Sequence, residues 1–339
     1  MTPRLTEGAR DPRILRQDPA LGMVGAFRPM RKGMRGKLDV QMAWGDAVIR
    51  WRGPDQLSIT DQSVLFAVME QAMLQWRDDQ QGCLVGADDA LWQRLEHKQA
   101  EFAPALARVT TSFRRLAQLC GQGDGGTELA QVRAALQRLT ETTLSVRKGQ
   151  QEGSSRLLAW TVSDEHRVAL VLNWRLTNAL QGLSYARVSM TERARLRSEP
   201  AQALHAVLSC KVDLGKAWDC QLQDLQRYVW GDTLVEGSSR RKRHSRLRDV
   251  LAEIHALPGW TARVNGNAVR VARGSANWRS TKGAAKKSEN RTITPVVSVT
   301  PRRNAHETPS IQGRPATRKS NDGAGFEVVD VSVQISQRR

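Results

Sequence analysis

A basic amphipathic helix followed directly by a β-hairpin, at residues 237–273, constrains the fold more than any other feature of this sequence. The helix is predicted to begin at Gly237-Ser238-Ser239 and to run to about Ala256, because apolar residues recur at three- and four-residue steps. These apolar residues are Leu247, Val250, Leu251 and Ile254. Pro258-Gly259 ends the helix, and Asn265-Gly266 in WTARVNGNAVRVAR is the strongest short hairpin signal. With helices also predicted over 191–209 and 222–229, this order is that of a winged helix, a helix-turn-helix followed by a hairpin wing.

The first half of the chain shows the same order of elements. A helix is predicted over 58–76, capped by Ser58 or Thr60, after a strand pair at 37–44 and 47–51. A short helix that ends at Gly121 and a second that begins at Thr127 form a helix-turn-helix. The predicted strands that follow are 143–149, 155–162 and 167–172, with a polar tip at 150–154. We therefore expect an α+β fold of two tandem winged-helix domains, 36–183 and 184–273.

Both ends of the chain differ in composition from these domains. Residues 1–35 are rich in Pro, Gly and Arg and are interpreted as a mobile basic N-terminal arm. Residues 274–339 carry 12 basic and five acidic residues with few apolar ones, which predicts a disordered basic tail. Near its end, VVDVSVQI at 328–335 alternates apolar and polar residues, as either an edge strand for a partner or a chance pattern would.

The charge of the chain indicates the kind of partner. Its 339 residues have a formal net charge of +18, which favours a polyanion, most simply nucleic acid, over an anionic membrane or an acidic protein. No stretch approaches the ~18 uncharged apolar residues of a membrane helix, and the N-terminus has no apolar signal region. The four cysteines form no Cys-x-x-Cys pair, which argues against a disulfide framework and a zinc ribbon. We expect a cytoplasmic protein that does not bind a membrane.

The densest basic segment, SSRRKRHSRLR at 238–248, lies at the start of the predicted third helix of the second domain. At about 100° per residue, Arg241, Lys242, Ser245, Arg246 and Arg248 project away from the apolar face. Cations at a helix N-terminus oppose the helix dipole, so a purely structural role is disfavoured unless an anion binds there. In a helix-turn-helix this position meets base edges and phosphates. The candidate DNA-binding residues of this main recognition module are Ser239, Arg240, Arg241, Lys242, Arg243, Ser245, Arg246 and Arg248.

The first domain and the two wings supply further candidate contacts, in a less concentrated form. Glutamine can pair with adenine, although Gln and Arg are also ordinary residues of an exposed helix face. On the helix that begins at Thr127 the candidates are Gln131, Arg133, Gln137 and Arg138. The wing candidates, suited to phosphate or a minor groove, are Arg147, Lys148 and Arg156 in the first wing and Arg263 and Arg270 in the second.

The sequence contains no catalytic constellation. Gly121, Gly123 and Gly126 spell G-x-G-x-x-G, but they follow a helix instead of a strand and are interpreted as turn residues. There is no P-loop, and the six histidines form no His-x-His pair of the kind that a metal-dependent nicking enzyme needs. Tyr228, within YVW, is expected to pack in the core. We expect a protein that is not an enzyme and that uses no cofactor and no metal.

Four stretches of the chain resemble the RepC replication initiators of IncQ-type plasmids. They are DPALGMVGAFRPMRKGMRGKLDV (18–40), RVSM (187–190), YVW (228–230) and RRKRHSRLRDVLAEIHALPGW (240–260). The resemblance covers about 10–273, whereas 78–104 and the length of the tail are unlike the family. It implies a protein that binds direct repeats (iterons) at a plasmid origin as double-stranded DNA and promotes opening of an adjacent AT-rich region. It also implies separate partners, namely plasmid-encoded helicase and primase or host replication proteins.

Two other functions remain open from the sequence alone. The same winged helices suit a transcriptional regulator that binds a palindromic operator as a homodimer. A nickase or relaxase is the more distant alternative, which the missing His-x-His pair disfavours.

Overall fold

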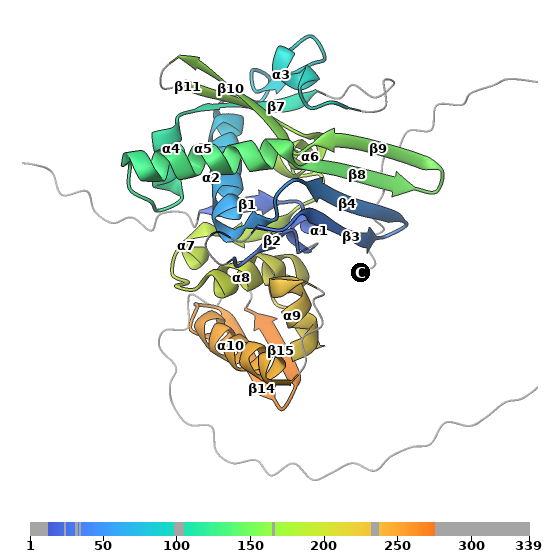
Figure 1. The fold of residues 1–339 in the computed structure, drawn as a ribbon, viewed down its shortest axis with the longest axis vertical. Helices are drawn as coiled ribbons and strands as arrows, with labels where there is room; N and C mark the ends of the chain where they lie inside the picture. Colours follow the sequence, from blue (N-terminus) through green and yellow to red (C-terminus); the bar gives the residue numbers. More distant parts are fainter. Residues whose placement is uncertain are drawn as a thin grey trace, which may run out of the picture. The chain divides into compact units, whose positions relative to one another are not determined.

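Two clusters of three helices dominate the computed structural model, which describes residues 13–23, 25–30, 33, 35–97, 105–164, 167–231 and 237–274 (Figure 1). The first cluster consists of α2 (Ile59–Asp78), α4 (Phe113–Leu119) and α5 (Gly126–Glu141), which pack on one another. The second consists of α8 (Glu199–Lys211), α9 (Leu222–Trp230) and α10 (Gly237–His255), which also pack on one another. The predicted tail, including 328–335, lies outside the described residues except for Gly274.

The first cluster is tied together at the N-terminus of α2. Ser58 is the cap: its Oγ accepts the Asp61 N–H at 3.2 Å, while Asp61 Oδ2 accepts the Ser58 N–H at 2.7 Å. The Asp61 carboxylate, whose side chain is wholly buried, also pairs with Arg35 at 3.0 Å and with Arg138 of α5 at 2.7 Å. A buried charge is tolerated only when it is paired, so this carboxylate holds α5 onto the start of α2.

The second cluster begins with a break that the sequence interpretation did not include. Instead of one helix over 191–209, the structure has α7 (Met190–Arg193) and then α8. Ser198 caps α8 through its Oγ, which accepts the Ala201 N–H, and Pro200 lies in the first turn. Proline has no N–H to donate, which would break a hydrogen bond inside a continuous helix but costs nothing in the first turn, so a new helix begins here.

A three-stranded antiparallel sheet completes the second cluster. Its central strand is β15 (Ala268–Arg273), with β13 (Ala217–Gln221) on one side and β14 (Trp260–Asn265) on the other. The hairpin β14–β15, with Asn265 opposite Ala268, confirms the prediction from Asn265-Gly266. The short strand β13 was not predicted from its five residues.

The strands of the first half are arranged differently from the prediction. The hairpin after α5 consists of β8 (Thr143–Lys148) and β9 (Gln151–Arg156), and it joins β3 (Leu38–Trp44) and β4 (Ala47–Gly53) in one sheet of order β3-β4-β8-β9. The predicted strand 155–162 is in fact divided between β9 and β10 (Leu158–Asp164). A second sheet has the order β10-β11-β7-β6, the other members being β11 (Arg167–Leu172), β7 (Leu106–Thr111) and β6 (Leu84–Val85).

The N-terminal residues that are described contradict the prediction of a mobile arm. Strand β1 (Ile14–Gln17) pairs antiparallel with β12 (Ala186–Ser189), and β2 (Phe27–Arg28) pairs parallel with β5 (Leu57–Ser58). Between them, α1 (Pro19–Met23) is buried. The apolar side chains of this segment face the core. The prediction of a mobile arm rested on the Pro, Gly and Arg content of the segment and did not take these side chains into account.

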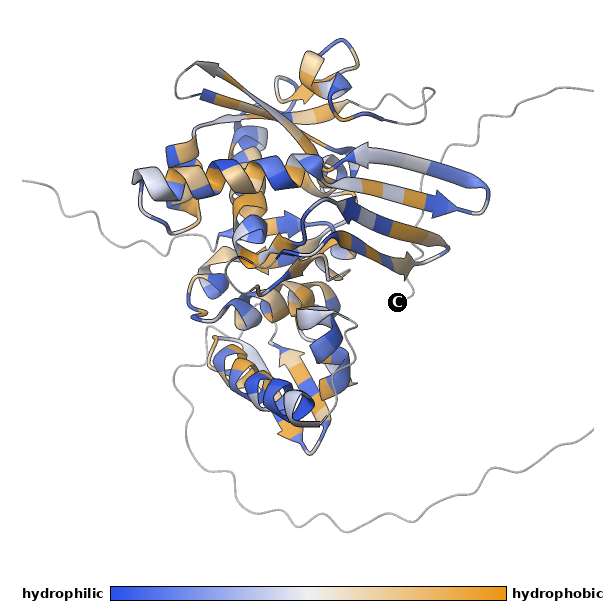
Figure 2. Ribbon diagram, in the orientation of Figure 1, coloured by the Kyte–Doolittle hydropathy of each residue, from blue (hydrophilic) through white to orange (hydrophobic). Residues whose placement is uncertain are grey.

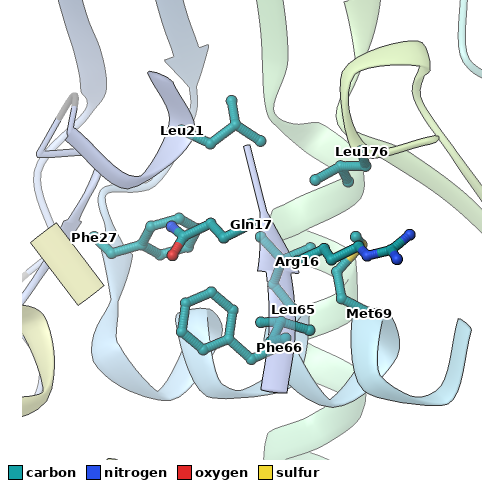
Figure 3. Close-up of a pocket in the computed structure, with 9 residues that line it drawn as sticks. Arg16, Gln17, Leu21, Phe27, Leu65, Phe66, Met69 and Leu176 are labelled. Atoms are coloured by element: carbon teal, nitrogen blue, oxygen red, sulfur yellow. The ribbon is translucent and has the colours of Figure 1, made fainter. Parts of the chain in front are cut away.

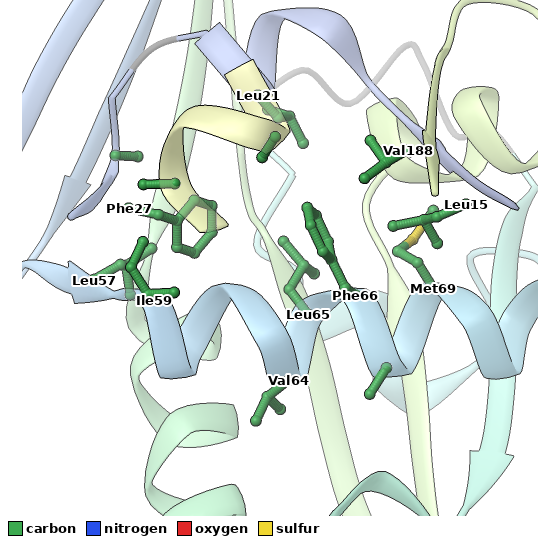
Figure 4. Close-up of a cluster of buried hydrophobic side chains, with 14 of the residues drawn as sticks. Leu15, Leu21, Phe27, Leu57, Ile59, Val64, Leu65, Phe66, Met69 and Val188 are labelled. Atoms are coloured by element: carbon green, nitrogen blue, oxygen red, sulfur yellow. The ribbon is translucent and has the colours of Figure 1, made fainter. Parts of the chain in front are cut away.

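One main hydrophobic core runs through both helix clusters. Figure 4 shows the part where Leu15, Leu21 and Phe27 meet Phe66 and Met69 of α2. A smaller core lies beside α3 (Ala90–Gln93), and α6 (Trp174–Gln181) packs against α2 and β1. None of the described helices is long and apolar enough to cross a membrane.

Candidate nucleic-acid interface

The basic segment 238–248 forms the first half of α10, and the helix has the rotational phase that the sequence predicts. His244, Leu247, Val250, Leu251 and Ile254 are the buried residues of this helix. The other residues of 238–248 are exposed except for Arg243, and the N-terminal part of α10 is blue (hydrophilic) in Figure 2. The exposed candidates are Ser239, Arg240, Arg241, Lys242, Ser245, Arg246 and Arg248.

Four cations of this surface have no acidic partner within the part of the chain that the structure describes. Among the described residues, Arg240, Arg241, Lys242 and Arg246 form no ion pair, and the first turn of α10 contains no acidic residue. Three of these charges, on Arg240, Arg241 and Lys242, therefore lie near the start of a helix, where the backbone already contributes a positive potential. An arrangement that is unfavourable for the isolated protein is favourable for one that binds a polyanion.

Arg243 and His244 lie closer to the body of the protein than their neighbours. The Arg243 guanidinium is half-buried over the Trp230 ring, 5.7 Å from its centroid, and burial lowers the pKa of Arg243. Burial, together with the charges of Arg240 and Arg248, also lowers the pKa of His244. Arg243 is thus placed to orient α10 against α9, unlike the fully exposed cations.

The β14–β15 hairpin extends the basic surface. Arg248 Nη2 donates to the carbonyl oxygen of Gly266 in the hairpin turn at 3.2 Å, which joins helix and hairpin. Arg263 and Arg270 lie directly opposite each other on β14 and β15, both exposed. Arg270 pairs with Asp219 of β13 at 2.9 Å, whereas Arg263 has no ion pair among the described residues.

In the first cluster, the candidates of α5 are divided between solvent and core. Gln131, Arg133 and Gln137 are exposed, although Arg133 lies over the Phe113 ring and Gln137 donates to Glu141. Arg138 does not lie on the outer face as predicted. Its guanidinium is held by the buried Asp61, so we no longer assign it to DNA.

The first hairpin has fewer available cations than the sequence indicates. Arg147 is exposed, but Lys148 pairs with Asp46 at 2.9 Å and Arg156 pairs with Glu96. The structure adds Arg52 of β4, which is exposed and opposite Thr143 of β8. Arg147 and Arg52 share a face of this sheet, because residues two apart along a strand point the same way.

The sequence analysis missed Arg52, although a signal for it was available. In AVIRWRG, Ile49 and Trp51 are buried, which places Arg50 and Arg52 on the opposite face. The sequence does not indicate that the β3–β4 hairpin pairs with the β8–β9 hairpin, which follows α5.

Other kinds of site are weakly represented. Within the described residues, no group of three His, Cys, Asp or Glu side chains could hold a metal ion. A small cavity between the N-terminal segment and α2 is lined mainly by apolar groups, together with the side chains of Arg16 and Gln17 (Figure 3).

Comparison with known proteins gives one family and one set of folds. The sequence model of the family described as Replication protein C (RepC) matches residues 10–273. None of the curated proteins matches the chain. A crystal structure of domains 2 and 3 of RctB is similar with a TM-score of 0.50 at 11% identity, over 75% of this chain and 97% of that one. A second crystal structure of RctB domains 2-3 has a TM-score of 0.44 at 13% identity, over 75% and 96% of the two chains. At such identities the likeness concerns the fold alone.

Proposed function

The chain belongs to the Replication protein C (RepC) family, and from this membership we propose that it initiates plasmid replication by binding double-stranded DNA at the origin. The observation that carries the proposal is the row of exposed cations on the first half of α10, four of which (Arg240, Arg241, Lys242 and Arg246) have no ion pair with any described residue. A helix with this charge, followed by a basic hairpin, suits a major groove and its flanking phosphates.

We further propose that both helix clusters are winged helices. In this proposal α10 is the main recognition helix, and the β14–β15 hairpin is a wing whose Arg263 contacts phosphate. In the first cluster α5 presents Gln131, Arg133 and Gln137 to the DNA. Arg147 and Arg52, on the neighbouring sheet, contact the DNA backbone. If the two modules neutralise roughly 6 to 10 phosphates, affinity falls by about 10³ to 10⁵ between 50 and 200 mM salt.

The sites are direct repeats, and binding to several of them promotes opening of an adjacent AT-rich region. Bending or untwisting DNA requires the least free energy at flexible, weakly paired steps. The free energy of cooperative binding therefore drives strand separation at those steps. Plasmid-encoded helicase and primase, or host replication proteins, then load onto the exposed strands. The chain itself performs no chemistry in this proposal and acts in the cytoplasm.

Fluorescence anisotropy against repeats from the plasmid's own origin tests the proposal, with scrambled DNA of equal length and base composition as competitor. We expect binding at least a hundredfold tighter to the repeats. Equal affinity for the two duplexes would reduce the protein to a non-specific binder.

Two further measurements separate the alternatives. A palindromic site, a homodimer on DNA and no support of an origin plasmid in trans would favour an operator-binding regulator. Nicking of supercoiled plasmid in the presence of Mg²⁺ or Mn²⁺ would favour a DNA-processing enzyme.

Permanganate footprinting of a supercoiled origin plasmid tests the opening step, because unpaired thymines must appear if it occurs.

A further inference from the structure

Residues 13–28, described apart from Val24, contact both helix clusters, and we call this segment the strap. It contains β1, α1 and β2. Its elements pack against α2 of the first cluster and against α8 and α9 of the second.

The strap is bound to the first cluster through α2. Leu15 and Phe27 lie against Leu65, Phe66 and Met69, and Figure 4 shows these side chains pointing toward one another. Polar contacts add to this packing. Arg13 pairs with Glu70, and the backbone N–H of Arg16 donates to the Met73 sulfur at 3.4 Å.

The strap is bound equally closely to the second half. Its β1 forms a ladder with β12, in which Ile14 is opposite Ser189, and the Met190 N–H donates to the Arg13 carbonyl at 2.8 Å. Gly22 lies so close to α8 that a Cβ built there would overlap Cys210 Sγ. At the far end, the Arg28 guanidinium covers Gly231, at the end of α9.

Direct contact between the clusters also passes close to the strap. Arg193 Nη2 donates to Ser63 Oγ at 3.2 Å, and its guanidinium lies 5.0 Å from the Phe66 ring centroid. Phe66 is itself packed against the strap. The relative placement of α5 and α10 therefore depends on a layer in which the strap is the central element.

We propose that the strap sets the separation of α5 and α10 and thereby specifies the spacing between the DNA segments that they bind. This inference rests on the proposed function. DNA turns once in about 10 to 10.5 bp, so two rigidly held helices accept only one spacing and phase. A loosened strap would leave both clusters able to bind DNA but indifferent to the spacing.

The first part of the test concerns the free protein. Gly22→Leu inserts a side chain between α1 and α8, and Gly36→Leu is the matched control because nothing lies within 4 Å of a Cβ at Gly36. Nitroxide labels are attached at the exposed Ala134 of α5 and Asp249 of α10 through a ketone-bearing amino acid, so the native cysteines remain untouched. Double electron–electron resonance should give a narrow distance distribution for wild type and Gly36→Leu, and a broad one for Gly22→Leu.

The second part uses DNA. An origin repeat is compared with the same repeat carrying an insertion of 5 bp, about half a turn. The insertion lies between the DNA segment that binds α5 and the segment that binds α10. We expect the insertion to weaken wild type and Gly36→Leu by at least about tenfold and Gly22→Leu by less than about threefold. The milder variant Arg13→Ala with Arg16→Ala provides the same comparison if Gly22→Leu does not fold.

Each outcome decides a different claim. A narrow distance distribution in a folded strap variant, or an unchanged insertion penalty, would overturn the strap's role. Loss of preference for repeats over scrambled DNA in wild type would overturn the proposed function instead. In that case the distance distributions would still decide whether the strap holds the two helices apart.

Discussion

Asp18 and Arg175 form an ion pair across 157 positions of the chain, and both side chains are almost fully buried. Arg175 Nη2 donates to Asp18 Oδ1 at 3.0 Å, and Arg175 Nε lies 2.7 Å from Oδ2. The same carboxylate accepts the Ala20 N–H at 2.8 Å, at the start of α1. One buried charge therefore orients α1 of the strap and attaches it to α6.

Asp18→Asn should lower the free energy of unfolding by about 3 to 5 kcal/mol, because it leaves the Arg175 guanidinium buried without its counter-charge. Urea denaturation followed by circular dichroism measures this. The matched control is Asp124→Asn, whose pair with Arg114 is exposed on both sides and should leave the midpoint unchanged. Equal effects of the two substitutions on the free energy of unfolding would show that the buried pair at Asp18 stabilises the protein no more than an exposed pair does.

Arg241→Ala combined with Lys242→Ala should abolish sequence-specific DNA binding while leaving the melting temperature within a few degrees, since both side chains are exposed. If both cations contact phosphate, the slope of log K against log salt should also become less negative by about 2. Anisotropy at several salt concentrations gives both quantities. Arg77→Ala with Arg94→Ala removes the same charge from exposed positions elsewhere and should cost little specific affinity. Similar losses for both pairs would mean that only net charge matters.

Arg138→Ala should affect stability and not DNA binding. Its guanidinium compensates the wholly buried Asp61, so its loss should cost about 1 to 3 kcal/mol, with Arg35 retaining part of the pairing. Arg133→Ala, one turn earlier and exposed, should show the reverse pattern. Denaturant titration and anisotropy on the same preparations test the contrast, and a large loss of affinity in a stable Arg138→Ala protein would contradict it.

The stability of the second half should fall as the pH drops below about 6.5. His205 is fully buried with its Nε2 3.0 Å from Glu192 Oε2, and desolvation lowers the pKa of His205 against the opposing effect of Glu192. An unfolded chain, with an ordinary histidine pKa of about 6.5, then binds a proton that the folded chain resists. The contribution of neutral His205 to the free energy of unfolding is thus complete above about pH 6.5 and is lost as the pH falls toward the pKa of His205 in the folded protein.

Urea denaturation at pH 7.5, 6.5 and 5.5 measures this slope, which for one proton is at most about 1.4 kcal/mol per pH unit. His205→Gln should flatten it, whereas His255→Gln, at an exposed position, should not. Glu192 adds a loss only at lower pH. Desolvation raises its pKa, but hydrogen bonds from His205 and Trp260 and the charge of Arg273 outweigh this and lower it below 4.5. An unchanged slope in His205→Gln would assign the pH dependence to other groups.

The features that the sequence predicts well are those set by local periodicity. The exposure of Arg241, Lys242 and Arg246 follows from the buried positions Leu247 and Val250 of the same helix, and the β14–β15 turn follows from Asn265-Gly266. Each depends on residues within one or two turns of its neighbours.

The features that the sequence could not reveal depend on partners far away in the chain. Arg138 has the spacing of an exposed residue, and only Asp61, 77 positions earlier, draws it inward. The first hairpin is joined to β4 through pairs such as Ile49 with Val146, which no local pattern encodes. The strap was interpreted as mobile because its composition is that of a loop, while its apolar residues find their partners on α2.

The pairing of β1 with β12 has a consequence for the synthesis of the protein. Ile14 leaves the ribosome 175 residues before Ser189, its partner in the ladder. At about 5 to 20 residues per second, translation takes roughly 10 to 35 s to cover that distance. During this time the first helix cluster can assemble, but β1 has an open edge, which is the kind of surface that chaperones bind. Strand β1 therefore completes its pairing only after Ser189 has been made.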